Sequence, residues 1–200
     1  MPLDELKSRL GGRTGLDESE VEVAGKSYRI LHPSAADALI DETEFEIDER
    51  LPYWAVIWPS AIALARQIST LDLSGKRVLE LGCGVGLPSA VALDLGAKVT
   101  ATDHYTIALD FARQNARVNT DEELATAHLD WHSPDDVSLG RFDLILAADV
   151  LYEQRNIPAL AALVPDLLAP EGGILVSNPR RRDAPRFQEI LESRGFAAST

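Results

Sequence analysis

The sequence contains a single cysteine, Cys83, among its 200 residues. One cysteine excludes a disulfide within the chain and any metal site built from several thiolates. No apolar run approaches the roughly 20 residues that a membrane-spanning helix requires. The opening segment MPLDELKSRLGGRTG also lacks the apolar core of a secretory signal. We therefore expect a cytoplasmic protein that does not contact the membrane.

Basic residues are scarce as well. Lys and Arg number 19 against 32 Asp and Glu, which gives a net charge of −13. An acidic surface repels phosphate backbones, so we expect no nucleic-acid partner, whereas a basic protein partner is compatible with it. Three of the histidines, at 104, 128 and 132, are scattered around the predicted strand ends, and we predict no metal site. The oligomeric state cannot be read from these features.

Residues 1–58 are predicted to form an N-terminal extension. We expect a loose helix or arm over 1–15, a β-hairpin over 21–31 and a short helix over 34–42, followed by an acidic stretch over 41–50. The hairpin prediction rests on apolar residues that alternate around an Ala-Gly-Lys turn.

Residues 59–200 alternate between helical and strand patterns. We predict strands at 77–82, 98–103, 123–131, 142–152 and 174–179, and helices at 59–69, 88–96, 106–119, 157–170 and 184–195, with a turn at Gly172 and Gly173. Strands that alternate with helices of this length predict an α/β fold, with a doubly wound, mostly parallel sheet and helices on both faces. The chain is thus expected to be one domain.

Three glycines follow the first of these strands at alternate positions. Gly82, Gly84 and Gly86 stand after Glu80 in the pattern E-x-G-x-G-x-G. The dinucleotide pattern G-x-G-x-x-G would require its third glycine at position 87, which is Leu87, so an NAD oxidoreductase is disfavoured. A cluster of glycines lets a ligand approach the backbone closely, and we predict a nucleoside cofactor at this turn.

The next strand ends in Asp103, where a carboxylate can accept both hydroxyl groups of a ribose. NAD and S-adenosylmethionine both carry such a ribose, so Asp103 supports a nucleoside without choosing between them. Capping of the helix that follows is a compatible role.

The chain resembles the class I, seven-β-strand S-adenosylmethionine-dependent methyltransferases. The resemblance rests on the glycine motif together with Asp103, the pair Asp130-Trp131 and the run LAADVLY. Within that group the D-x-x-Y motif at 149–152 is similar to that of protein-lysine methyltransferases. The segment PYWAVIWPSAIALAR resembles the electron-transfer flavoprotein β-subunit lysine methyltransferases.

The resemblance implies S-adenosylmethionine as cofactor, S-adenosylhomocysteine as product and a protein substrate that presents a lysine. The implied cofactor-binding residues are Trp58, Glu80, Gly82, Gly84, Gly86, Asp103, Asp130, Trp131 and Ala148. Asp149 would dock the incoming cation and Tyr152 would orient it. Packing alone is the competing interpretation for Trp131 and Trp54, and an N-cap role is the competing interpretation for Asp149.

One departure from this group concerns the C-terminal part of the sheet. Only five residues follow Gly195, too few for the antiparallel strand pair that closes a seven-stranded sheet, so we expect that pair to be incomplete. A basic cluster at 178–186 is expected to be a solvated loop or a contact for an acidic partner. A small-molecule N-methyltransferase and a cofactor-binding protein without turnover stay open as alternatives.

Overall fold

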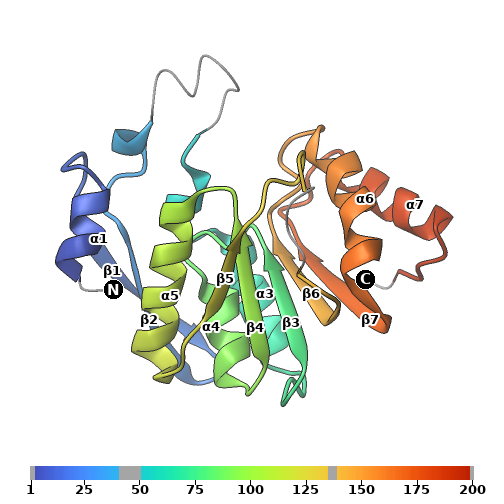
Figure 1. Cartoon of the computed structure of the whole chain (residues 1–200), viewed down its shortest axis with the longest axis horizontal. Helices are drawn as coiled ribbons and strands as arrows, with labels where there is room; N and C mark the ends of the chain where they lie inside the picture. The colour runs from blue at the N-terminus through green and yellow to red at the C-terminus, as the bar shows by residue number, and fades with distance from the viewer. Residues whose placement is uncertain (1–2, 41–50, 135–138, 199–200) are drawn as a thin grey trace.

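The computed structural model describes residues 3–40, 51–134 and 139–198 (Figure 1). The predicted acidic stretch at 41–50 and the end of the predicted short helix lie outside these residues.

The centre of the molecule is a five-stranded sheet in which every neighbouring pair of strands is parallel. The strand order is β5-β4-β3-β6-β7, with bounds β3 Arg77–Leu81, β4 Lys98–Asp103, β5 Ala125–His128, β6 Phe142–Ala148 and β7 Leu168–Ser177. The order reverses between β3 and β6, which places the topological switch point between these two strands. The α/β prediction is confirmed.

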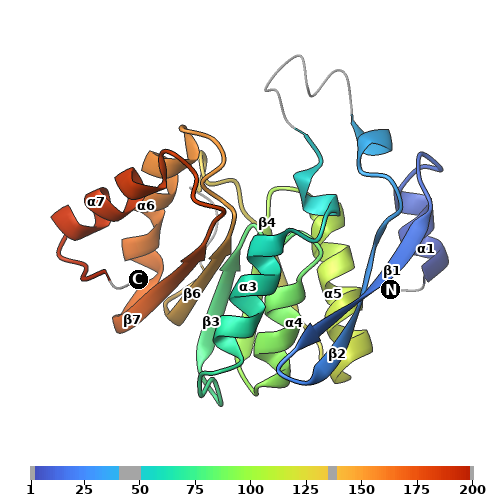
Figure 2. The ribbon, with the colours of Figure 1, turned by 180° about the vertical axis from the view of Figure 1, so that it is seen from behind.

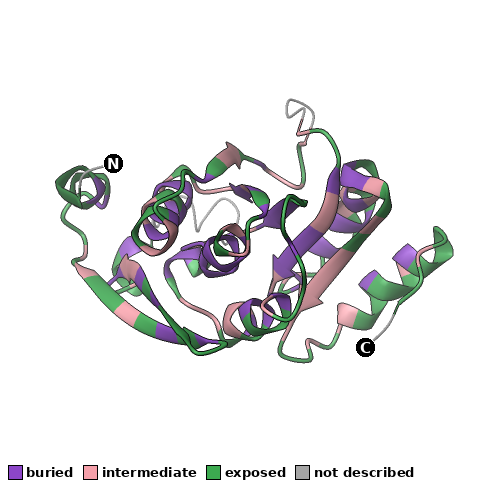
Figure 3. Cartoon of the chain, turned by 90° about the horizontal axis from the view of Figure 1, so that it is seen from below, coloured by how far each residue is buried: buried purple, intermediate pink, exposed green. Residues whose placement is uncertain are grey.

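Five helices cover the two faces of this sheet. Helices α3 (Pro59–Ile68), α4 (Leu87–Asp94) and α5 (Thr106–Thr120) lie on one face, and α6 (Asn156–Leu167) and α7 (Ala184–Ser193) lie on the other (Figures 1 and 2). A strand between two helical layers must be apolar on both sides, which explains the continuous apolar run of β6. Figure 3 shows buried residues on the strands and the inner helix faces, while α7 is mostly exposed.

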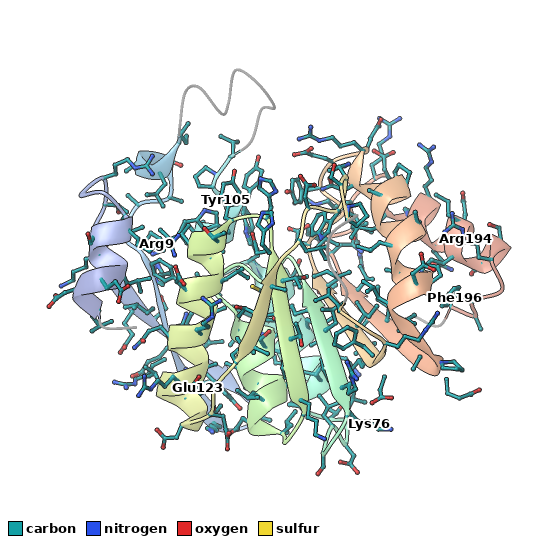
Figure 4. The ribbon with its side chains drawn as sticks, viewed as in Figure 1. Arg9, Lys76, Tyr105, Glu123, Arg194 and Phe196 are labelled. Atoms are coloured by element: carbon teal, nitrogen blue, oxygen red, sulfur yellow. The ribbon has the colours of Figure 1, made fainter. Side chains whose placement is uncertain are left out.

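The N-terminal extension packs on α5 rather than forming a loose arm. Helix α1 (Leu3–Arg9) buries Leu6, and Leu10 follows it into the core. Arg9 reaches from α1 to α5, where its guanidinium pairs with Asp110 and donates to the hydroxyl of Thr106 at 3.0 Å (Figure 4). Of the expected loose helix or arm, the helix forms, and it is ordered because two leucines and one ion pair fix it.

The predicted hairpin is confirmed as strands β1 (Leu16–Val23) and β2 (Lys26–Pro33), joined at Ala24 and Gly25. Asn115 of α5 connects this hairpin to the turn after β3. Its amide oxygen accepts the Leu31 N–H at 2.8 Å, and its amide nitrogen donates to the Leu31 carbonyl at 2.9 Å and the Val85 carbonyl at 2.8 Å. A buried side chain with every polar atom paired fixes its neighbours precisely.

Several local predictions differ from the structure. Gly172 and Gly173 lie inside β7, where the ladder with β6 shifts register between Phe142 and Leu144, and not in a turn. In the described part of the segment 34–42, only the 3₁₀ turn η1 (Asp37–Leu39) forms. Within the described residues no helix is both long and apolar enough to cross a membrane.

Candidate active site

A cavity of about 260 Å³ opens at the carboxyl edge of the sheet, at the switch point. Leu81 of β3 pairs with Thr102 of β4 and with Ala147 of β6, so the segments that follow these three strands converge. The predicted site residues at 58, 80, 82, 84, 103, 130, 131, 148, 149 and 152 all line this cavity. Gly86 belongs to the same turn but lies beneath it, against α5.

The turn after β3 has no room for side chains at its glycines. A Cβ on Gly82 would lie 3.0 Å from Cζ2 of Trp131, and one on Gly84 would lie 2.9 Å from the carbonyl oxygen of Trp54. All three glycines have positive φ values, between +51° and +80°. The turn therefore needs glycine both for its backbone conformation and for close packing.

Glu80 is fully buried at the floor of the cavity. Its carboxylate accepts a hydrogen bond from the hydroxyl of Ser89, which lies in the first turns of α4. Burial raises the pKa of Glu80 to about 8, and the hydrogen bond from Ser89 opposes this shift only in part. In the free protein the side chain is therefore largely protonated at neutral pH, and a cationic ligand would favour its ionised form.

Asp103 connects the end of β4 to the glycine turn. One carboxylate oxygen accepts the Gly84 N–H at 2.9 Å, and the other accepts the Tyr105 N–H at 2.9 Å. Burial raises the pKa of Asp103 to about 6. Asp130, after β5, accepts the His132 N–H at 2.9 Å and lies 3.5 Å from Nδ1 of His104.

Trp131 packs its indole ring over Gly82, and its Nε1 is buried without a hydrogen-bond partner among the described residues. Such an orphaned donor on a cavity wall is available to a ligand acceptor. Packing beside Gly82 accounts for the position of the indole ring and leaves its Nε1 donor unpaired.

Two aromatic residues ahead of α3, Tyr53 and Trp58, and one after β6, Tyr152, form what we define as the aromatic mouth of the cavity. The Tyr53 ring lies edge-on to those of Trp58 and Tyr152, with ring centroids 5.9 Å and 5.2 Å apart. Trp58 Nε1 donates to the Tyr53 carbonyl at 2.9 Å. Burial raises the pKa of Tyr152 to about 12, so its hydroxyl stays protonated at neutral pH.

Trp54 and Trp58 stand four residues apart, a spacing that would place them on one face of an α-helix. This segment is not an α-helix, so the two rings do not share a helix face. Tyr53–Ala55 is a 3₁₀ turn, and Trp58 precedes α3 in an extended conformation. Trp54 is buried against Phe111, with ring centroids 5.4 Å apart. The packing interpretation of Trp54 agrees with this position.

Asp149 emerges from the end of β6 in the left-handed conformation, with φ of 55°, and is 7% exposed. It is not an N-cap, because α6 begins only at Asn156. Its carboxylate is held by Arg181 through two hydrogen bonds, from Nε at 2.5 Å and from Nη2 at 2.9 Å. The basic cluster at 178–186 is therefore not only a solvated loop, since one of its arginines turns inward to the cavity.

Sequence reasoning missed Arg181, Ser89 and Tyr105 as cavity or partner residues. Arg181 follows β7, the neighbour of β6, so adjacency in the sheet was the signal that placed it beside Asp149. Tyr105 begins α5 at the carboxyl edge and lines the cavity (Figure 4). Within the described ranges, no group of three or more His, Cys, Asp or Glu is arranged to hold a metal.

A family model described as lysine methyltransferase matches residues 41–194. The chain belongs to this family. The methyltransferase is 34% identical over 157 residues to protein N-lysine methyltransferase METTL21A of Danio rerio, a match that covers 74% of this chain and 72% of the relative. It is also 36% identical over 118 residues to histone-arginine methyltransferase METTL23 of Mus musculus, over 56% of this chain and about half (47%) of that relative.

Solved structures agree with the fold of the methyltransferase. A ribosomal protein L11 methylase from Lactobacillus delbrueckii subsp. bulgaricus superposes with a TM-score of 0.62 at 24% identity, over 72% of this chain and 73% of that chain. The predicted class I methyltransferase and its cofactor, S-adenosylmethionine, are confirmed, and NAD is not the cofactor.

The residues of this cavity fit that cofactor. Gly82 and Gly84 bring the backbone of the turn to the cavity wall, Asp103 offers a carboxylate, and the unpaired Nε1 of Trp131 offers a donor. The buried carboxyl of Glu80 provides a group that can ionise beside a positive charge.

Gly86→Ala tests the close packing of the turn. A Cβ at this position would lie 2.6 Å from Cβ of Ala112 in α5, at a φ of +80°. Gly25→Ala is the matched control, because Gly25 has a φ of +81° and nothing within 4 Å. The left-handed conformation alone costs about 1–2 kcal/mol, and we expect Gly86→Ala to lower the free energy of unfolding by about 2 kcal/mol more than the control. Urea unfolding measures both, and equal losses would contradict the packing argument.

Glu80→Gln tests the buried carboxyl through pH. The unfolded chain ionises Glu80 near its ordinary pKa of 4.5, whereas the folded protein keeps the proton up to about pH 8. Ionisation in the unfolded state alone lowers wild-type stability as pH rises from about 5 to 8.

The glutamine variant lacks this loss, so its stability relative to wild type should rise by at least about 1 kcal/mol over that range, since one pKa unit corresponds to about 1.4 kcal/mol. Urea unfolding of cofactor-free protein at pH 5, 6.5 and 8 measures it, with exposed Glu122→Gln as control. A difference that stays constant with pH would refute the assigned pKa shift.

Proposed function

We propose that this methyltransferase transfers a methyl group from S-adenosylmethionine to the side-chain amine of a lysine on a partner protein. The observation that carries the proposal is the placement of a buried carboxylate, Asp149, between the glycine turn and an exposed aromatic mouth. Membership of the lysine methyltransferase family supports the same acceptor.

Cofactor binding is proposed for the residues on the β3, β4 and β5 side of the cavity. Glu80, Gly82 and Gly84 would hold the amino-acid end, with Gly86 keeping the turn against α5, while Asp103 would accept the ribose hydroxyls. Asp130, Trp131 and Ala148 would border the adenine, and Trp58 would cover the cofactor from the N-terminal side. When bound, S-adenosylmethionine supplies a methyl group on a positively charged sulfur.

The acceptor side must deliver a neutral amine, because only an unprotonated lysine nitrogen can attack a methyl group. The ordinary pKa of lysine is about 10.4, and contact with aromatic rings in place of water disfavours the ammonium form. Tyr152, neutral at working pH, would orient the nitrogen rather than take its proton. Asp149 would receive the cation and align the nitrogen after the proton leaves to solvent through the exposed mouth.

An arginine acceptor is the second candidate, and one observation favours it. The carboxylate of Asp149 already holds a guanidinium, that of Arg181, through two hydrogen bonds. The mouse relative that is 36% identical carries the name histone-arginine methyltransferase. The two acceptors differ in their product, methyl-lysine or methyl-arginine.

We also propose a cellular compartment and a domain organisation for this methyltransferase. The free, buried thiol of Cys83 is typical of cytoplasmic proteins, and we propose the cytoplasm as the compartment. We also propose a single methyltransferase domain over 1–200, because the extension at 1–58 shares its core with α5 and the glycine turn.

Asp149→Asn tests the acceptor role directly. The variant keeps the shape of the side chain but loses the charge that would receive a cation, so transfer of labelled methyl into proteins of a host lysate should fall by about 10²-fold or more. Cofactor affinity, measured by calorimetry with S-adenosylhomocysteine, should stay within a few-fold of wild type.

The matched control is Asp166→Asn, which makes the same chemical change at an exposed position of α6. It should leave both readouts unchanged. Loss of cofactor binding in Asp149→Asn, or intact transfer, would show that Asp149 does not serve the acceptor.

A further inference from the structure

The side chain proposed to receive the substrate cation is already occupied by a cation of the chain itself. Arg181 donates from Nε and Nη2 to the two oxygens of Asp149, in the fork geometry that makes arginine–carboxylate pairs strong. The Asp149 side chain is 7% exposed, so little solvent reaches the carboxylate. The Arg181 side chain is 33% exposed and lies on the solvent side of the pair.

The loop that carries Arg181 is held in place on both sides. The Arg181 N–H donates to Oδ1 of Asn178 at 3.0 Å, which fixes the turn after β7. Gln154, five residues beyond Asp149, donates from Nε2 to Oδ2 of Asp183 at 3.1 Å. The guanidinium thus approaches Asp149 from a defined direction.

The guanidinium also lies at the aromatic mouth. Arg181 lines the cavity together with Tyr53, Tyr152 and Asp149. Glu153, the residue after Tyr152, accepts a hydrogen bond from Nε of Arg155. Two of the carboxylates that line the cavity, those of Asp149 and Glu153, thus already have arginine partners when a basic acceptor enters.

We propose that Arg181 is a selectivity latch, which occupies the acceptor position on Asp149 until a basic side chain of the substrate displaces it. This inference rests on the proposed acceptor role of Asp149. A tethered cation competes at a high effective concentration, so a free amine displaces it only at high concentration, whereas an acceptor with further contacts outside the cavity displaces it more readily. The latch would make free amines poor substrates and favour a side chain presented by a docked protein.

Binding of n-butylammonium, which has the end group of lysine, tests the latch without requiring turnover. Calorimetry is done at pH 8 on protein saturated with S-adenosylhomocysteine. We expect Arg181→Gln to bind the probe at least about tenfold more tightly than wild type, because the tethered competitor is gone. Arg181→Lys keeps one charge but loses the fork, and should be intermediate.

Arg182→Gln is the matched control, since it removes the same charge from an exposed neighbour in the same loop and should bind like wild type. The double variant Arg181→Gln/Asp149→Asn should lose the gain. Three outcomes would each overturn the latch and leave Arg181 with a structural role alone. They are equal or weaker binding by Arg181→Gln, no binding by any form, and a gain in affinity that survives in the double variant.

A second measurement uses the wild-type protein and does not depend on how the glutamine variant folds. The Nε–H resonance of Arg181 is identified as the one that disappears from the NMR spectrum in Arg181→Lys. In wild type, this resonance should shift as n-butylammonium is added. A resonance that stays in place at saturation would contradict displacement. Methyl transfer by wild type into lysate reports the proposed function separately, so either claim can fail while the other stands.

Discussion

The turn after β3 can exist only because three of its residues have no side chain. Trp131 lies over Gly82, the backbone of Trp54 lies against Gly84, and Ala112 of α5 lies against Gly86. Each contact is too close for a Cβ atom, and each comes from a different part of the chain. The absence of side chains at these three positions thus lets the N-terminal segment, α5 and the segment after β5 meet at one place.

Hydrogen bonds from buried polar side chains also hold the turn after β3 against its neighbours. Asp103 joins β4 to the turn through the Gly84 N–H, and Asn115 joins the turn to the N-terminal hairpin through the Val85 carbonyl. The described part of the N-terminal extension is therefore part of the cavity wall and not an appendage. Its aromatic residues, Tyr53 and Trp58, reach the acceptor side from there.

Buried charge divides the cavity into two chemically different halves. On the cofactor side, burial keeps Glu80 largely protonated until a positive ligand arrives. On the acceptor side, Asp149 stays paired with a guanidinium that a substrate must displace, if the latch operates. Both carboxyl groups are in this way neutralised in the free protein, one by a proton and the other by an arginine, and both are suited to a cationic partner.

Much of this arrangement could be predicted from the sequence, because strand and helix periodicity is local. The strands at 98–103 and 142–148 and the positions of Glu80, Asp103 and Asp149 at the carboxyl edge follow from apolar runs that end in acidic residues. The strand position of Gly172 and Gly173 could not be predicted, since a register shift with β6 decides it. The pairing of Arg181 with Asp149 joins residues 32 positions apart and depends on the order of strands in the sheet, which no local pattern encodes.

The most direct test of the central claim is the chemical identity of the methylated side chain. Wild-type protein and labelled S-adenosylmethionine are added to a host lysate, and the labelled product is isolated and sequenced by tandem mass spectrometry. Our account predicts methyl-lysine on a discrete protein, absent when the Asp149→Asn enzyme is used. Methyl-arginine on that protein, or label confined to the small-molecule fraction, would contradict it.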